Sequence, residues 1–115
     1  MITSLTTPQL ICLSLTAETK EALFDEMASM LAADGAINNK QQFLKDVWSR
    51  ENLDCTGFEQ GVALPHAKSS AVVRPALVVG VSPKGIEYGA EDSLPTQLIF
   101  MIASPEGGAN QHIEV

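Results

Sequence analysis

The fold and function predicted for this chain depend most on one stretch, Gly61-Val62-Ala63-Leu64-Pro65-His66-Ala67-Lys68-Ser69. Its apolar first half is typical of a β-strand, and the run stops at a proline. Because Pro65 has no amide hydrogen to donate to a neighbouring strand, it belongs at the end or the edge of a strand. The stretch therefore predicts that His66, one of two histidines in 115 residues, lies at the rim of a sheet, where solvent and a partner reach it.

Helices and strands alternate before this stretch. Residues 10–15 predict a short strand, and Thr16 is suited to cap a helix that stops at Gly35, a residue that tolerates the left-handed conformation after a last turn. A second helix opens at Asn39, with Gln42 three residues on in capping-box register. Apolar side chains recur at helical spacing in both segments, so each helix has one face for a core.

Two further strands follow. Residues 76–82 and 98–103 are apolar runs typical of buried strands, and residues 83–96 between them predict a loop with room for a short hairpin. Asn110 then opens a helix that the sequence leaves at Val115, inside its first turn, so we expect a fragment whose missing helix leaves apolar sheet surface uncovered. The alternation predicts an α/β fold with a mixed sheet: a flexible lead-in over residues 1–9 and one domain over residues 10–115.

Composition excludes several classes of function. The formal net charge is −7 and the isoelectric point is about 4.6, which argues against binding to nucleic acid or to an anionic membrane and favours a basic protein partner. No apolar run reaches the roughly 18 residues of a membrane span, and the first residues do not have the pattern of a signal peptide. Cys12 and Cys55 match no metal spacing; we interpret them as reduced thiols of a cytoplasmic protein, with a disulfide or a reactive thiol as the alternative.

His66 is suited to carry a phosphoryl group. Its ring is largely neutral near pH 7, and phosphoryl transfer needs mainly positioning and stabilisation of charge. Arg50, near the end of the second helix, offers a planar cation for the phosphoryl oxygens. His112, in the first turn of a helix, is a neutral hydrogen-bond donor by the effect of the helix dipole.

Two other roles for His66 remain open from the residues alone. Both histidines with Glu59 or Glu114 would make a metal site, although no metal-binding spacing is present. Ser69 or Ser70 with a histidine base would make a hydrolase, although the Gly-x-Ser-x-Gly turn is absent. The chain also has no glycine loop of the nucleotide-binding type, so ATP is not expected as the direct donor.

Residues 56–67, Thr-Gly-Phe-Glu-Gln-Gly-Val-Ala-Leu-Pro-His-Ala, resemble the active-site signature of the enzyme IIA domains of the fructose/mannitol class, part of the bacterial phosphoenolpyruvate-dependent sugar phosphotransferase system. The similarity extends over residues 17–115 and includes the Arg50-Glu51 pair and the closing segment around His112. The resemblance implies a mixed β-sheet flanked by helices on both faces, truncated here at its C-terminus, and no metal or organic cofactor.

The resemblance also implies a role for each site residue. His66 would be the phosphorylated residue, with Arg50 and His112 holding the phosphoryl oxygens. The donor would be the phosphorylated histidine-containing carrier protein of that system. The acceptor would be a cysteine of an enzyme IIB domain, which passes the group to sugar at the membrane enzyme IIC. The alternative is a regulatory, nitrogen-type enzyme IIA, which controls partner proteins according to its phosphorylation state.

This sequence departs from the family pattern at two places. Glu59 stands where the family usually has a small residue, and the chain ends at Val115 where the family's domain usually continues.

Overall fold

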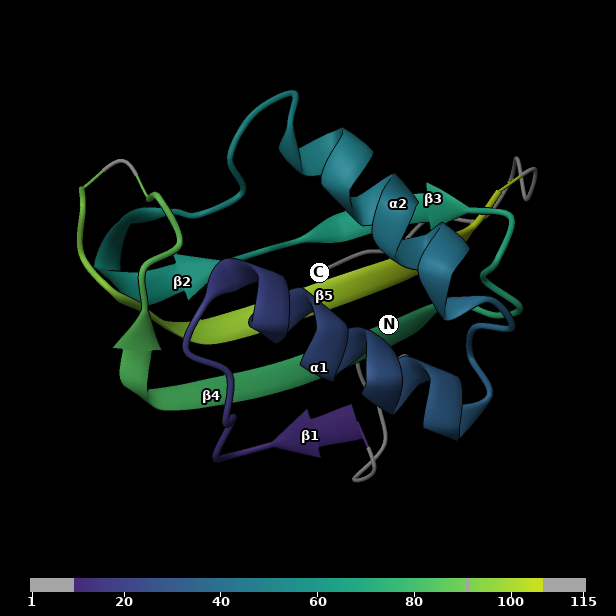
Figure 1. The fold of residues 1–115 in the computed structure, drawn as a ribbon, viewed down its shortest axis with the longest axis horizontal. Helices are drawn as coiled ribbons and strands as arrows, with labels where there is room; N and C mark the ends of the chain where they lie inside the picture. Colours follow the sequence, from purple (N-terminus) through teal and green to yellow (C-terminus); the bar gives the residue numbers. More distant parts are fainter. Residues whose placement is uncertain (1–9, 91, 107–115) are drawn as a thin grey trace.

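A mixed sheet of five strands forms the centre of the fold in the computed structural model, which describes residues 10–90 and 92–106. Strand β1 (Ile11–Cys12) pairs in parallel with β4 (Ala76–Ile86), and β4 runs antiparallel to β5 (Thr96–Pro105). On its other side β5 pairs in parallel with β2 (Val62–Ala63) and β3 (His66–Ser69). The predicted α/β fold with a mixed sheet is confirmed (Figure 1).

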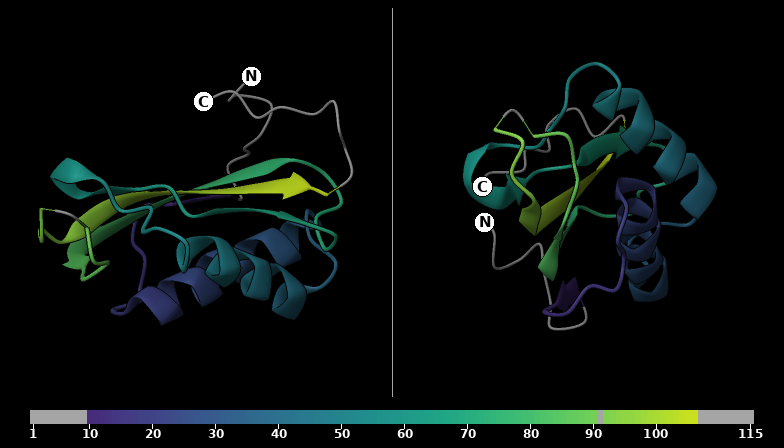
Figure 2. Two further views of the ribbon diagram at one scale, coloured as in Figure 1. Left: turned by 90° about the horizontal axis from the view of Figure 1, so that it is seen from above. Right: turned by 60° about the vertical axis from the view of Figure 1, so that its left-hand side comes forward.

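The two helices lie side by side on one face of the sheet (Figure 2). Helix α1 (Lys20–Asp34) packs against β4 and α2 (Lys40–Glu51) packs against β3. The helical cover expected on the opposite face depends on the helix predicted from Asn110, which lies outside the described residues.

Local capping sets the ends of the helices. Helix α1 begins at Lys20 rather than beside Thr16, because the side chain of Thr19 accepts from Ala22 N at 3.1 Å. The amide of Thr16 donates to the carboxylate of Glu26 in α1 at 3.2 Å, so this segment is held beside the helix and does not begin it. Gly35 ends α1 in the left-handed conformation, with φ 85°, as the sequence predicted.

Helix α2 begins as expected. Asn39 caps it by accepting from Gln42 N at 3.1 Å. The Gln42 side chain donates to Asp46 rather than back to Asn39, so only half of the capping box forms.

The core lies between the helices and the sheet. Alternate residues of β5 point into it and are buried, whereas their neighbours in the strand are only partly buried. The largest fully buried side chains include Phe24, Met27 and Leu31 from α1, Phe43 and Val47 from α2, and Ile99 and Met101 from β5.

The long pair β4 and β5 extends into the segment predicted as a loop. Strand β4 continues to Ile86, which pairs with Thr96 after an irregularity that begins at Val81. Gly85 adopts φ 82° there, a conformation that glycine accepts at no steric cost. The predicted loop at residues 83–96 is thus shorter, and its ends belong to the hairpin.

Candidate active site around His66

His66 is the first residue of β3, an edge segment that pairs only with β5 among the described strands. Strand β2 stops at Ala63, but pairing with β5 continues across Pro65, because its carbonyl accepts from Ile102 N at 3.0 Å. His66 therefore begins a second strand instead of following the end of one. It lies along the side edge of the sheet, which β3 forms (Figure 1). Its side chain is half-buried.

One backbone contact fixes the form of the His66 ring. Nδ1 lies 2.8 Å from the carbonyl oxygen of Leu64. Because a carbonyl oxygen only accepts hydrogen bonds, Nδ1 must carry the hydrogen. The neutral ring then presents Nε2 with its lone pair, and Nε2 has no hydrogen-bonding partner in the part of the chain that the structure describes.

A short antiparallel pairing holds Leu64. Its amide donates to Thr56 O at 3.0 Å, and Phe58 N donates to Val62 O at 2.7 Å. Gly57 pairs with Ala63 between these two bonds. A Cβ at Gly57 would lie 2.7 Å from a ring carbon of Tyr88, so glycine is required by this close approach.

Arg50 lies in the last turn of α2 and is half-exposed. Its Nη1 donates to Asp54 O at 3.0 Å and ties the turn after the helix to the helix end. Within residues 10–90 and 92–106, the guanidinium makes no hydrogen bond to His66. His112 lies outside the described residues, and the predicted trio of His66, Arg50 and His112 stays a prediction.

A buried polar network sits beside this turn, and the sequence reasoning missed it. Glu51, with a side chain 3% exposed, accepts from Lys20 Nζ at 2.8 Å. The same carboxylate accepts from both Thr56 N, at 2.9 Å, and Thr56 Oγ1, at 2.6 Å. The hydroxyl of Tyr88 lies 2.6 Å from Thr56 Oγ1. An acidic residue at the negative end of a helix is unfavourable by itself, and this was the signal in the sequence that Glu51 has cationic and N–H partners elsewhere.

The network shifts the titration of two groups. Burial raises the pKa of Glu51, but hydrogen bonds from Lys20 and Thr56 outweigh burial and hold that pKa below 4.5, its ordinary value. Burial raises the pKa of the Tyr88 hydroxyl far above its usual range, so this group stays protonated. The site therefore contains a fixed carboxylate held by donors on several sides.

The remaining candidate residues are placed as follows. Ser69 is fully buried and donates to Asp46 Oδ2 at 2.6 Å, which disfavours it as a hydrolase nucleophile. Glu59 is exposed and opens a short 3₁₀ turn (Glu59–Gly61) before β2. Cys12 and Cys55 are free thiols. Glu114, offered as a metal ligand with the two histidines, lies outside the described residues.

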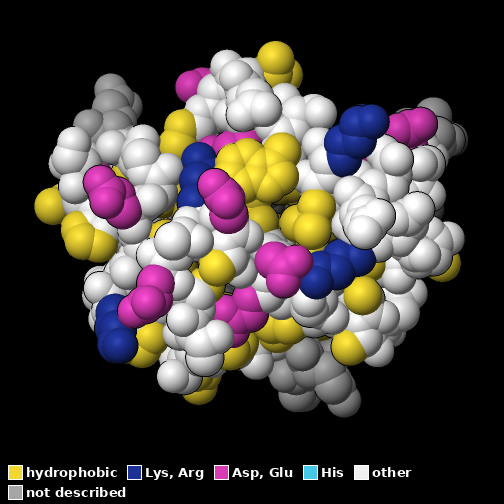
Figure 3. Space-filling model, in the orientation of Figure 1, with side chains coloured by type: hydrophobic (Ala, Val, Ile, Leu, Met, Phe, Trp, Pro, Cys, Tyr) yellow, Lys and Arg dark blue, Asp and Glu magenta, His cyan; other side chains and the backbone are white. Residues whose placement is uncertain are grey.

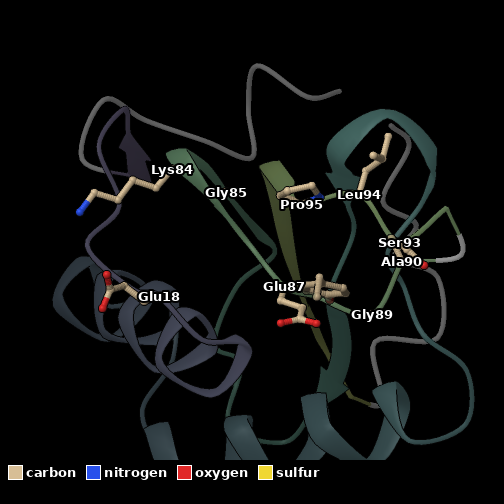
Figure 4. A pocket seen from close by; sticks show the side chains of 10 residues that line it. Glu18, Lys84, Gly85, Glu87, Gly89, Ala90, Ser93, Leu94 and Pro95 are labelled. Atoms are coloured by element: carbon tan, nitrogen blue, oxygen red, sulfur yellow. The ribbon is translucent and has the colours of Figure 1, made fainter.

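A pocket of about 520 Å³ lies at the β4–β5 hairpin, away from His66. Its lining includes Glu18, Lys84, Glu87, Tyr88 and Leu94 (Figure 4). Glu18 precedes α1, whereas Lys84 and Glu87 lie at and just after the end of β4, and in the described part of the chain no polar contact joins them across the pocket. The pocket therefore adds no group to the His66 site.

The helical face of the molecule carries acidic and basic side chains interspersed with apolar ones (Figure 3). Among the described helices, neither is long and apolar enough to cross a membrane.

Comparison with known proteins identifies the family. Residues 4–115 match the family described as "Phosphoenolpyruvate-dependent sugar phosphotransferase system, EIIA 2". The chain is 39% identical over 113 residues to the PTS system fructose-specific EIIABC component of Bacillus subtilis. The match covers 98% of this chain and 18% of that protein. The chain thus spans under a fifth of the length of that relative.

Solved structures share the fold. The nitrogen regulatory protein IIA-Ntr of Neisseria meningitidis superposes with a TM-score of 0.83 at 25% identity, covering 92% of this chain and 72% of that one. An Escherichia coli structure of enzyme IIA mannitol in complex with phosphorylated enzyme IIB gives a TM-score of 0.75 at 22% identity, covering 90% and 72%.

The mixed sheet with its helices, the Leu-Pro-His segment at the sheet edge and the family match agree with one another. The chain belongs to the EIIA type-2 family of the phosphoenolpyruvate-dependent sugar phosphotransferase system.

Proposed function

We propose that His66 accepts a phosphoryl group on Nε2 and passes it on to another protein. The observation that carries this proposal is the hydrogen bond from Nδ1 to Leu64 O, at 2.8 Å, which leaves the lone pair on the half-exposed ring at Nε2. A neutral, oriented imidazole with one free nitrogen is the form that nucleophilic catalysis requires.

The transfer balances without any additional reagent. The Nε2 lone pair forms a bond to phosphorus while the nitrogen–phosphorus bond of a phosphohistidine donor breaks and its electron pair returns to the donor ring. The His66 ring gains positive charge as it gives up that lone pair, and the Leu64 carbonyl facing Nδ1–H stabilises this charge. In the next step a thiolate attacks phosphorus, and the electron pair returns to Nε2.

Arg50 and His112 complete the proposed site. The guanidinium of Arg50 is suited to the developing charge on the phosphoryl oxygens, and it is half-exposed at the end of α2. His112 would add a neutral donor. The resemblance to the family implies this role for both residues, and their approach to His66 is part of the proposal.

The proposed partners are those that the resemblance to the family implies. The proposed donor is a phosphorylated histidine-containing carrier protein, and the proposed acceptor is a cysteine of an enzyme IIB domain. The E. coli domain with the same fold was solved in complex with phosphorylated enzyme IIB. The B. subtilis relative is named as a fructose-specific EIIABC component, so we propose fructose-class uptake through a membrane enzyme IIC, with this domain in the cytoplasm.

The test is transfer of label from phosphoenolpyruvate through enzyme I and the carrier protein. Wild type should become labelled at His66, and His66→Ala should not. Ser70→Ala, an exposed neighbour, is the control and should match wild type. Label on His66→Ala at the wild-type rate would contradict the proposal.

A second arm tests Arg50. Arg50→Ala should slow transfer, because it removes up to about 3 kcal/mol of transition-state stabilisation. Arg74→Ala, which loses an exposed ion pair with Asp34, is the matched control and should leave the rate unchanged. Equal rates for Arg50→Ala and wild type would remove Arg50 from the site.

The alternative function is regulatory, because the chain superposes closely on the nitrogen regulatory protein of N. meningitidis. In that case the negative charge on phosphorylated His66 would change the affinity for a partner protein. A reconstituted enzyme IIB cysteine that takes label from this domain favours transport. Failure of every IIB domain to accept the label favours regulation.

A further inference from the structure

We propose that Glu51 and Thr56 are positioning residues for the reaction of His66. We call their contact the Glu51–Thr56 clamp: the carboxylate of Glu51 with the amide and the hydroxyl of Thr56. This inference rests on the proposed function, because it concerns how the reacting ring is held.

The clamp fixes Thr56 from three directions. Its amide and hydroxyl both donate to the Glu51 carboxylate, at 2.9 and 2.6 Å. The hydroxyl of Thr56 has a single hydrogen, which it donates to Glu51. The Tyr88 hydroxyl, 2.6 Å from Thr56 Oγ1 and 3.2 Å from Glu51 Oε1, therefore donates to the nearer Thr56 Oγ1. Thr56 is 2% exposed, so water does not replace these contacts.

The carboxylate is itself anchored to a different helix. Lys20, the first residue of α1, donates to Glu51 Oε2 at 2.8 Å, and its ammonium lies 4.2 Å from the centre of the Tyr88 ring. Glu51 is the last residue of α2. The clamp thus joins the end of α2 to the segment before β2, and Lys20 ties both to the start of α1, 31 residues before Glu51.

The fixed Thr56 determines where Leu64 lies. Thr56 O accepts from Leu64 N at 3.0 Å, and Leu64 O accepts from His66 Nδ1 at 2.8 Å. Two hydrogen bonds through one residue therefore connect the clamp to the imidazole. A shift of Thr56 moves the acceptor that holds the hydrogen on Nδ1.

The chemistry explains why this matters. If Leu64 O moves away, the ring loses its preference for the Nδ1–H tautomer, and molecules with hydrogen on Nε2 have no lone pair at the reacting nitrogen. The bound ring also turns more freely, which lowers the fraction of reactive geometries. The clamp touches neither the phosphoryl group nor Nε2, so its effect is indirect.

The experiment compares Thr56→Val, which replaces the hydroxyl with a methyl group and keeps the amide bond to Glu51, with Thr56→Ser, which retains the hydroxyl. Single-turnover transfer from the phosphorylated carrier should be about tenfold slower in Thr56→Val and restored in Thr56→Ser. Tautomers are read independently from two-bond ¹H–¹⁵N correlations of ¹⁵N-labelled histidine, since the chain has only two histidines. Wild type should show Nδ1–H at His66, and Thr56→Val should show an increased Nε2–H fraction.

A stability control separates positioning from general loosening. Leu31 is fully buried in α1, well along the helix from Lys20. Leu31→Val should lower stability without changing the His66 tautomer or the transfer rate of the folded protein. If Leu31→Val slows transfer as much as Thr56→Val, or if Thr56→Val keeps the wild-type rate or tautomer, the clamp is overturned while the phosphocarrier proposal stands. Wild type that takes no label at His66 would overturn both.

Discussion

At the scale of single residues, the reactivity of His66 depends on a carbonyl two positions earlier in the chain. The hydrogen bond from Nδ1 to Leu64 O forms where Leu64 and Pro65 separate β2 from β3, while pairing with β5 continues in the same direction across both residues. The exposed position of the ring could be predicted from the sequence, because that prediction depends only on the missing N–H of Pro65. The sequence did not predict which carbonyl the ring would face, because that depends on pairing with β5 and with residues 56–58.

The buried carboxylate of Glu51 should make the free energy of unfolding depend on pH in the acid range. The pKa of Glu51 is below 4.5 in the folded protein. The charged carboxylate therefore stabilises the fold at pH values above the pKa of the unfolded chain, and this stabilisation is lost as the pH falls through the pKa of the folded protein. Glu51→Gln resembles the protonated residue at every pH. At pH 7 we expect the free energy of unfolding of Glu51→Gln to be lower by about 2 kcal/mol, because charge-assisted hydrogen bonds are lost.

The difference between the two proteins should narrow as pH falls below 4.5. The measurement is urea unfolding followed by the fluorescence of Trp48, the single tryptophan. Glu21→Gln, at an exposed carboxylate in the first turn of α1, is the control and should give a small, nearly constant difference. A Glu51→Gln difference that stays constant down to pH 3 would contradict the assignment of the stabilised charge to Glu51.

At the scale of elements, the cap of α2 is a local interaction with a measurable contribution. Asn39 accepts from Gln42 N at 3.1 Å and satisfies one free amide of the first turn. Asn39→Ala should lower the free energy of unfolding by about 1 kcal/mol. Asn38→Ala, at the preceding exposed asparagine, should change it little, because the contact of Asn38 is made by its backbone amide. Equal losses in urea unfolding would show that the cap does not stabilise α2.

Element boundaries were predictable where the signal is local. The Asn39 cap and the Gly35 stop depend on side chains within a few residues, and both were predicted. The predicted start of α1 was wrong by a few residues. The amide of Thr16 binds Glu26, ten residues later in the chain and inside α1, a contact that residues near Thr16 do not reveal. The strands were underestimated for a similar reason: Ile86 joins β4 by pairing with Thr96, across a hairpin that neither segment reveals alone.

At the scale of the molecule, the two faces of the sheet differ. In β5 the residues facing the helices, such as Ile99 and Met101, are fully buried, whereas Phe100 and Ile102 on the other face are partly buried. A strand that is apolar on both faces is typical of a sheet covered on both sides. The resemblance to the family implies helices on both faces, and in the described residues α1 and α2 cover one of them (Figure 2).

The net charge of −7 makes a prediction about the whole molecule in its encounter with the carrier protein. An acidic surface attracts a basic partner before contact, and salt screens this attraction beyond about 8–10 Å. The second-order rate of phosphoryl transfer should therefore fall by about an order of magnitude between low and high salt, while the rate at saturating carrier stays constant. Stopped-flow transfer at several salt concentrations measures both.

Glu59→Gln removes an exposed charge three residues before β2. It should reduce the salt dependence more than Glu21→Gln in α1 does. A second-order rate that does not change with salt would mean that apolar contacts alone bring the two proteins together.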